Sequence, residues 1–292
     1  MTDDIASCRD AIVQTFPDLR NAAFRPLTMG WHSLAIDVDN RLIFKFPKGD
    51  EAARALRREA RILAAARPHL AMPVPDLVLV DGPVLFSRHT KIHGDHLVSA
   101  QYEALPAVAR ERLADDLALF YRQVHALDPG VMRDAGAAAI QPWRPLGEIR
   151  STALPLVPPP LRALCEKTID AYETLGPDPL GTTYGFFDGH GWNMAFDHAQ
   201  GRLNGVYDFA DSGFGPLHQD FVYSAFISPR LTRLIVDRYA VLAGQLIDRR
   251  RVDILIGIHR LSELAELAAD PRHLEMARDS VAFWAAHRSA LA

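Results

Sequence analysis

The sequence predicts an α+β fold in two lobes, with an antiparallel sheet and one helix in residues 1–92 and mainly helices in residues 93–292. Two observations predict this division. Short apolar runs separated by turn residues dominate the first third of the chain, whereas apolar residues recur at helical spacing after Gly94. A chain of 292 residues is long enough to form two lobes around a cleft.

A hairpin of two strands is predicted near the N-terminus. The apolar runs at 31–38 and 42–46 are separated by Asp39-Asn40, a pair typical of tight hairpin turns. Lys45 lies inside the second run, LIFKFP, between two phenylalanines. A lysine in an apolar strand is costly unless its ammonium group meets an anion. Lys45 is therefore a candidate ligand for an anionic group.

Residues 51–66 are rich in Ala, Leu and Arg and predict a helix that carries Glu59, fourteen residues after Lys45. Taken alone, Glu59 is explained as a solvated glutamate in an i,i+4 pair. The arginines of this helix are expected on its solvated face: Arg54, Arg57, Arg58 and Arg61. Two further strands are predicted, at 77–80 and 84–88.

The second part of the chain begins with a long amphipathic helix predicted over 105–127. Its apolar residues follow one another at spacings of 4, 3, 4 and 3, which places them on one buried stripe: Leu113, Leu117, Phe120, Val124 and Leu127. The proline-rich segment 155–160 is expected to interrupt the helices as a loop.

The composition excludes several classes of protein. With 49% hydrophobic and 23% charged residues, the chain reads as an ordinary soluble globular protein. Its net charge of -4 argues against nucleic acid as a partner, since phosphate backbones bind basic surfaces. No secretory signal and no apolar run of membrane-spanning length is found, so the cytoplasm is the expected location and a membrane is not an expected partner. Cys8 and Cys165 are too few and too distant for a disulfide framework or a zinc site.

The segment YGFFDGHGWNMAFDHAQGRLNGVYDFAD has the layout of a phosphoryl-transfer site. Asp188 is followed five positions later by Asn193, then by an apolar strand, a turn, a second strand and Asp208. Phosphoryl transfer needs one carboxylate to orient a hydroxyl and accept its proton, and oxygen ligands to hold Mg²⁺ on a triphosphate. Asp188 is the candidate base, and Asn193 and Asp208 are the candidate metal ligands. The alternative is a pair of exposed turns whose acids serve only turn chemistry.

This segment resembles the catalytic and metal-binding loops of the aminoglycoside phosphotransferase family, small-molecule kinases related in fold to protein kinases. The family pattern H-G-D-x-H-x-x-N corresponds to FFDGHGWN, from Phe186 to Asn193. Two phenylalanines replace the first His and Gly, and Phe186 cannot make the hydrogen bonds of an imidazole. The resemblance implies a protein-kinase-like fold of two lobes. It also implies that His125 and Asp220 brace the catalytic loop rather than react.

The resemblance assigns roles to residues upstream of this loop. Lys45 and Glu59 would form the ion pair that positions the lysine on the nucleotide. Gly30 and Ser33 would form a short phosphate loop. The segment TKIHG with Leu97 resembles the family's I-x-G-x-x-L linker between the lobes. Thr90 and Ile92 would bind the nucleotide base through main-chain groups, which leaves ATP and GTP as alternative donors.

Three acids near the C-terminus are candidates for binding the phosphoryl acceptor. Glu263, Glu266 and Asp270 have spacings of 3 and 4, which predicts one helical face suited to a polycationic aminoglycoside. The alternative is a solvated charged face. The segments FKFPK and TKIHG are most similar to the two-double-prime branch of the family.

The function expected from the sequence is transfer of the terminal phosphoryl group of a nucleoside triphosphate to a hydroxyl of a small molecule, with an aminoglycoside as one acceptor. The alternatives are a kinase of another hydroxyl compound, such as a macrolide, a sugar or an amino alcohol, and a nucleotide-binding pseudokinase. Pseudokinases commonly lack the lysine, the base or a metal ligand, and all of these are present here.

Overall fold

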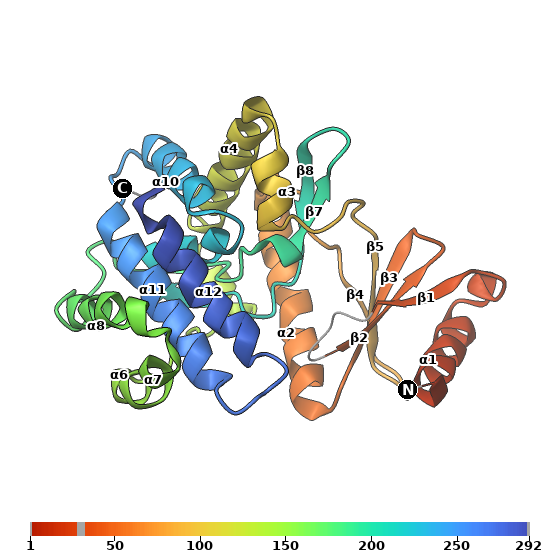
Figure 1. Cartoon of the computed structure of the whole chain (residues 1–292). Helices are drawn as coiled ribbons and strands as arrows, with labels where there is room; N and C mark the ends of the chain where they lie inside the picture. Colours follow the sequence, from red (N-terminus) through yellow and green to blue (C-terminus); the bar gives the residue numbers. More distant parts are fainter. Residues whose placement is uncertain (1, 28–32, 291–292) are drawn as a thin grey trace.

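An antiparallel sheet of five strands forms one end of the protein, and helices form the other (Figure 1). The computed structural model describes residues 2–27 and 33–290. The strands lie in the order β1-β2-β3-β5-β4. Their bounds are Phe24–Leu27 for β1, Ser33–Val38 for β2, Leu42–Pro47 for β3, Val78–Val80 for β4 and Phe86–Thr90 for β5. All four predicted strands are therefore confirmed, and β5 lies two residues further along the chain than expected.

The predicted hairpin turn joins β2 and β3. Asp39 and Asn40 have φ angles of 56° and 55°, the left-handed conformation that a two-residue hairpin of this type needs at both central positions. Asp and Asn tolerate this conformation better than most residues because their short polar side chains can hydrogen-bond locally. Here the Asp39 carboxylate accepts a hydrogen bond of 2.7 Å from the Ala23 N–H.

The two faces of the sheet have different neighbours. Helix α1 (Thr2–Thr15) contributes Ile12 to a core that contains Phe44, Phe46 and Phe86. Alternate strand residues point to opposite faces, so Lys45 lies on the other face. Helix α2 (Asp50–Ala66) covers that side and lies between the sheet and the helical part (Figure 1).

Helix α2 is fastened to the C-terminal part by apolar and polar contacts. Ile62 and Leu63 join the large hydrophobic core of the C-terminal helices. Arg58 donates to the Ala210 carbonyl at 2.9 Å, and Arg61 donates to the Ala135 carbonyl at 3.2 Å. Arg58 is partly buried, so the prediction that all its arginines face solvent is wrong for Arg58, whereas Arg61 remains exposed. Both arginines donate to backbone carbonyls of the segments that lie beside α2.

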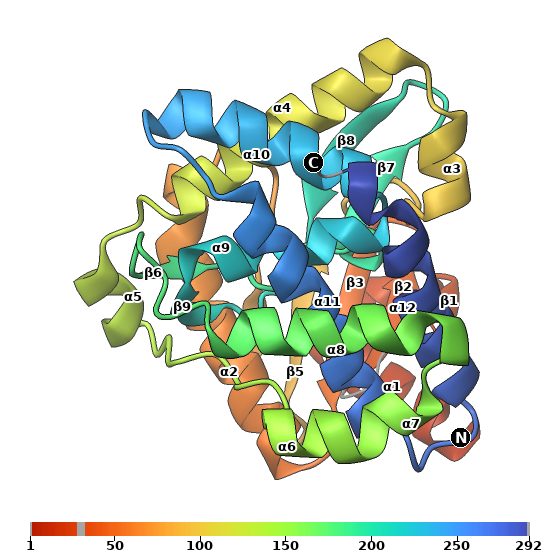
Figure 2. The ribbon, with the colours of Figure 1, turned by 60° about the vertical axis from the view of Figure 1, so that its left-hand side comes forward.

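The C-terminal part contains helices and two small antiparallel sheets, with α8, α11 and α12 packed together (Figure 2). The sheets pair β6 (Thr182–Gly185) with β9 (Gly213–Pro216), and β7 (Met194–Asp197) with β8 (Arg202–Val206). The longer helices are α4 (Ala107–Val124), α8 (Pro159–Glu173), α10 (Pro229–Ala243), α11 (Arg249–Glu266) and α12 (Leu274–His287). The shorter ones are α3 (Ser99–Ala104), α5 (Pro129–Asp134), α6 (Leu146–Glu148), α7 (Leu154–Leu156) and α9 (Leu217–Asp220), with 3-10 turns η4 (Gly191–Asn193) and η5 (Phe221–Phe226).

The amphipathic helix predicted over 105–127 is confirmed as α4, and all five residues of its apolar stripe are buried. The expected proline loop is wrong in extent, because α7 ends at Leu156 and α8 begins at Pro159. Both helices carry a proline in their first turn, where the missing N–H has no intrahelical partner to lose. Among the helices that the structure describes, none has the length and apolarity needed to cross a bilayer.

Candidate active site

The hairpin of β7 and β8 brings Asn193 and Asp208 to the same place. Asn193 directly precedes β7, and Asp208 lies two residues beyond β8. The Tyr207 N–H donates to the Asn193 carbonyl at 3.0 Å, which joins the two ends of the hairpin. The predicted strand, turn and strand are therefore confirmed, and the two candidate metal ligands are neighbours.

Asp188 is held by two side chains that follow it in the chain. One carboxylate oxygen accepts a hydrogen bond of 2.5 Å from Asn193 Nδ2, and the other lies 3.0 Å from His190 Nε2. Asn193 Nδ2 also donates to the Asp188 carbonyl at 3.1 Å. Burial opposes a charge on His190, but the adjacent Asp188 carboxylate outweighs it and raises the pKa of His190 above its ordinary value. These two contacts therefore fix the orientation of the Asp188 carboxylate.

Lys45 lies between two carboxylates from different parts of the chain. Its Nζ is 3.5 Å from Glu59 Oε1 and 3.5 Å from Asp208 Oδ1. Glu59 is only 3% exposed and also accepts the Phe209 N–H at 3.1 Å, so it is not the solvated glutamate of the alternative interpretation. Burial disfavours the charged form of Lys45, but the two carboxylates outweigh it and raise the pKa of its ammonium group. Lys45 is therefore a cation near neutral pH.

The buried carboxylate of Asp220 holds the backbone of the catalytic loop, residues 186–193. Asp220 accepts hydrogen bonds from the N–H groups of Phe186 at 2.9 Å and Phe187 at 2.5 Å. Its Oδ2 also lies 2.9 Å from His125 Nε2, and His125 Nδ1 lies 2.9 Å from the Tyr239 hydroxyl. Asp220 is the last residue of α9, and its carboxylate bonds to amides of the loop that contains Asp188.

Aromatic packing takes the place of the missing imidazole. The ring of Phe186 lies 5.4 Å from Phe120 of α4 in an edge-on arrangement and 4.8 Å from Phe209, the residue after Asp208. Phe187 occupies the position of the family's glycine and has a φ of 53°. A Cβ on Gly185 or on Gly215 would approach the Phe187 ring to 2.7 Å. These two glycines therefore leave the space into which the ring of Phe187 packs.

Gly189 packs against the buried side chain of Tyr121. A Cβ on Gly189 would overlap the hydroxyl of Tyr121, which lies in α4. That hydroxyl is buried and has no hydrogen-bond partner among the residues that the structure describes. The close contact explains why a glycine follows Asp188.

The linker to the C-terminal part runs beside the same hairpin. A Cβ on Gly205 of β8 would lie 2.9 Å from Ile92, and a Cβ on Gly94 would lie 2.5 Å from the Ala195 backbone. Thr90 ends β5 at the start of this linker. Ser33 begins β2, two residues from Ala35, which pairs with Lys45, so Ser33 lies on the Lys45 face of the sheet. Gly30 lies outside the residues that the structure describes.

The three candidate acceptor-binding acids do not share one helical face. Helix α11 ends at Glu266, and Asp270 lies beyond it in a turn, where its carboxylate accepts the Arg272 N–H at 3.0 Å. The prediction of a shared helical face is wrong for Asp270, because the helix ends four residues before it. Each acid has a cationic neighbour within 3.5 Å: Arg260 for Glu263, Arg144 for Glu266, and Arg272 for Asp270.

An aromatic wall extends from the catalytic loop towards Glu263. The His190 ring lies 5.3 Å from Trp192 and 6.2 Å from Phe226, and Phe226 lies 5.7 Å from His259. His259 Nδ1 is 3.6 Å from Glu263. Sequence reasoning left these four aromatic residues without a role. His190 is visible in the catalytic motif, whereas Phe226 and His259 carry no local signal because separate elements supply them.

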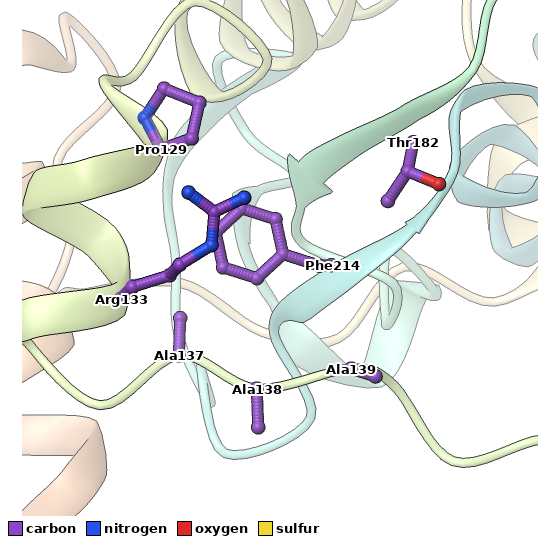
Figure 3. A pocket seen from close by; sticks show the side chains of 7 residues that line it. All are labelled: Pro129, Arg133, Ala137, Ala138, Ala139, Thr182 and Phe214. Carbon is purple, nitrogen blue, oxygen red and sulfur yellow. The ribbon is translucent and has the colours of Figure 1, made fainter.

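Residues that the structure describes also line cavities in this part of the protein. A cavity of about 200 Å³ adjoins the aromatic wall and is lined by Leu97, Val98, Ser99, Gly191, Trp192, Phe226 and Ile227. A larger one, of about 400 Å³, lies between α5 and β9, where the guanidinium of Arg133 stacks 4.8 Å from the ring of Phe214 (Figure 3). The larger cavity is lined by none of the predicted site residues.

The contact between Gly189 and Tyr121 makes a prediction about stability. Gly189→Ala should destabilise the protein by ~1–3 kcal/mol through overpacking. Tyr121→Phe should be close to neutral, because it removes a buried hydroxyl without a partner. In the double variant the methyl group would meet ring carbon Cζ, 3.2 Å away, so the cost of Gly189→Ala should fall by about 1 kcal/mol or more. Urea unfolding of the four proteins measures this coupling, and simple additivity would contradict it.

Comparisons with known proteins agree with this arrangement. The model of the phosphotransferase enzyme family matches residues 23–255, and no curated protein matches the chain. A GDP and kanamycin complex of APH(2″)-IIIa has a TM-score of 0.76 at 21% identity, covering 94% of this chain and 97% of that one. A streptomycin and ATP complex of APH(2″)-IIa has a TM-score of 0.60 at 17% identity, with coverages of 96% and 97%. The macrolide 2'-phosphotransferase MphH of Brachybacterium faecium has a TM-score of 0.67 at 16% identity, with coverages of 96% and 98%.

At these identities the solved structures show a shared fold, and the predicted kinase-like fold is confirmed. The family model covers the sheet, the linker, the catalytic loop and the hairpin with Asp208. Because that model spans most of the chain, the protein belongs to the phosphotransferase enzyme family.

Proposed function

We propose that the protein transfers the terminal phosphoryl group of ATP or GTP to a hydroxyl group of a small molecule, with Asp188 as the general base. One observation carries this proposal. Lys45 is held between Glu59 and Asp208, and the hairpin that ends at Asp208 begins at Asn193, which contacts Asp188. Lys45 as the cation for phosphate, Asp208 and Asn193 as metal ligands, and Asp188 as the base therefore lie next to one another in one site. A pseudokinase would not need this complete set. We expect the enzyme to act in the cytoplasm, where nucleotide and magnesium are available.

Asp188 is suited to receive the proton of the acceptor hydroxyl. Asn193 and His190 set the direction of its two oxygens. A carboxylate positioned in this way orients the hydroxyl and accepts its proton as the bond to phosphorus forms. Lys45 would contact phosphate oxygens, and Glu59 keeps its ammonium group in place from the buried side. Thr90 and Ile92 would bind the base, and Ser33, with Gly30, would lie near the phosphates.

Asn193 and Asp208 fit the ligand set of a magnesium ion. Asn193 uses its amide nitrogen on Asp188, which leaves its amide oxygen for a metal. Asp208 adds a carboxylate, and its side chain is 45% exposed. A magnesium ion there would neutralise charge on the phosphates. Within residues 2–27 and 33–290 no group of three His, Cys, Asp or Glu side chains could hold a metal without help, so phosphate and water oxygens would complete the set.

The acceptor would bind along the aromatic wall, opposite the nucleotide. Relatives with this fold include complexes with kanamycin and with streptomycin, and a macrolide 2'-phosphotransferase. Of the three candidate acids, we assign recognition of an acceptor amine to Glu263, because His259 and Phe226 connect it to His190 at the base. Glu266 and Asp270 would lie further out, each beside an arginine. The apolar surfaces of Trp192 and Phe226 would instead favour an acceptor with an apolar face, such as a macrolide.

The role of Asp188 is tested by Asp188→Asn. Turnover should fall by ~10²–10⁴-fold, the usual contribution of a general base. Nucleotide affinity should stay nearly unchanged, because the base contacts the acceptor. Nucleotide consumption with an acceptor measures the first, and calorimetry measures the second. Asp197→Asn, at the end of β7 in the same hairpin, is the control and should keep its activity. Retention of more than about a tenth of the rate in Asp188→Asn would remove Asp188 from this role.

The metal assignment is tested by calorimetry of ATP with and without magnesium. Asp208→Ala and Asn193→Ala should each reduce the gain in affinity that magnesium gives, because each removes an oxygen ligand. In the absence of magnesium, Asp208→Ala should bind ATP at least as tightly as the unmodified protein, since it removes a negative charge beside Lys45. An unaltered magnesium dependence in both variants would return these residues to turn chemistry.

The acceptor assignment is tested with kanamycin as a polycationic probe. Charge-assisted hydrogen bonds contribute ~1.5–3 kcal/mol, so Glu263→Gln should raise the KM for kanamycin by about tenfold or more and leave the KM for nucleotide unchanged. Asp270→Asn is the matched control, because Asp270 lies beyond the end of α11, and should leave both values unchanged. An unchanged KM in Glu263→Gln, or a best acceptor without positive charge, would exclude amine recognition by Glu263.

A further inference from the structure

Asp37 is a carboxylate in the middle of an apolar strand, on the face of the sheet that carries Lys45. The register of β2 and β3 pairs it with Ile43, and directly opposed residues of an antiparallel pair point to the same side. Residues two apart on a strand share that side, so Asp37 and Lys45 lie on one face. The Asp37 side chain is only 2% exposed. A carboxylate that is shielded from water in this way needs cations beside it.

Two cations meet the same oxygen of Asp37. Lys91 Nζ donates to Oδ2 at 2.7 Å, and Arg25 donates to it at 2.9 Å. Burial raises the pKa of the Asp37 carboxyl group, but the hydrogen bonds and charges of Lys91 and Arg25 outweigh it and hold the pKa below its ordinary value. Asp37 is therefore an anion near neutral pH. The two cations come from different places, because Arg25 lies on the edge strand β1 and Lys91 directly follows β5.

Lys91 fastens the start of the linker, residues 91–98 between β5 and α3, to the hairpin of β2 and β3. Its Nζ also donates to Asn40 Oδ1 at 2.7 Å, in the turn of that hairpin. Its backbone N–H donates to the Arg41 carbonyl at 2.8 Å. Together with the bond to Asp37, these contacts hold both the side chain and the backbone of Lys91. Moving the linker away from the sheet would therefore separate a paired charge.

The other end of the linker is held by the C-terminal part. Asn204 of β8 donates to the His93 carbonyl at 2.8 Å. Asp95 and Phe196 of β7 exchange backbone hydrogen bonds of 2.9 and 2.8 Å. Ile92 lies between these two anchored stretches, and within the residues that the structure describes its N–H and carbonyl groups make no hydrogen bond. The linker therefore holds unbonded main-chain groups at Ile92 between two fixed points.

We propose that Lys91 positions the main-chain groups of Ile92 for the nucleotide base. The inference rests on the proposed nucleotide site and deepens it by naming the side chain that sets its geometry. A base that bonds to a peptide backbone binds more tightly when that backbone is already fixed, because binding then orders fewer groups. Lys91 fixes one side of Ile92 through Asp37 and Asn40. Lys91 is thus a positioning residue, and its charge is used on Asp37 rather than on phosphate.

The test compares ATP with inorganic tripolyphosphate, which has a chain of three phosphates but no base, by calorimetry with magnesium. Lys91→Met should weaken ATP binding by about fivefold or more and leave the affinity for tripolyphosphate unchanged. Lys91→Arg keeps the cation and should retain most of the affinity for ATP. Arg25→Met is the matched control, because it removes a cation from the same oxygen of Asp37 without touching the linker. It should leave both affinities unchanged.

A second variant breaks the same contact from the other side. Asp37→Asn removes the anion and should weaken ATP binding without affecting tripolyphosphate. Combined with Lys91→Met it should add little further loss, since both changes remove one interaction. Should Lys91→Met not fold, Asp37→Asn compared with Arg25→Met decides the inference with the same two ligands.

Three results would overturn the role of Lys91 and leave the proposed function standing. They are an unchanged affinity for ATP in Lys91→Met, an equal loss for ATP and tripolyphosphate, and a loss of the same size in Arg25→Met. If the unmodified protein bound neither ligand, the proposed function would be overturned together with the inference.

Discussion

The site depends on the contacts that the Lys45 ammonium group makes with two carboxylates. This group lies 3.5 Å from carboxylates of α2 and of the segment after β8, so it joins the sheet, a helix and the C-terminal hairpin. A buried charge is tolerated only with counter-charges nearby, and removal of one partner leaves the others uncompensated. The relative positions of these three elements are therefore fixed by electrostatics as well as by apolar packing. The same arrangement keeps the Lys45 ammonium group charged and beside Asp208.

The catalytic loop is stabilised by a second buried carboxylate. Asp220 accepts two loop amides and contacts His125, which accounts for the direction of the peptide groups that precede Asp188. The two phenylalanines that replace the family's His-Gly are accommodated by packing. Phe186 contacts Phe120 and Phe209, while the ring of Phe187 occupies space left by glycines. Hydrogen bonds and ring contacts together hold the backbone that precedes Asp188, without an imidazole at position 186.

Charge on the acceptor side is balanced rather than accumulated. Each of the three acids has an arginine within 3.5 Å, and Arg260 is itself buried over the ring of Phe226. Burial, the largest effect, lowers the pKa of Arg260 to about 10, while Glu263 opposes this shift. In the proposed acceptor site, a cationic acceptor would compete with Arg260 for Glu263. The proposal therefore assigns recognition to the aromatic wall together with one carboxylate, because each of the three acids is already paired with an arginine.

The sequence by itself determined the elements whose signals are local. The turn at Asp39-Asn40, the helix with Glu59 and the hairpin between Asn193 and Asp208 depend on residues a few positions apart, and all were predicted. Only the tertiary structure decided which groups face one another. The arginine beside Glu266 and the rings of Phe226 and His259 near His190 come from packing between distant segments. Such contacts depend on how whole elements bury their apolar faces, and the pattern within any one element does not contain that information.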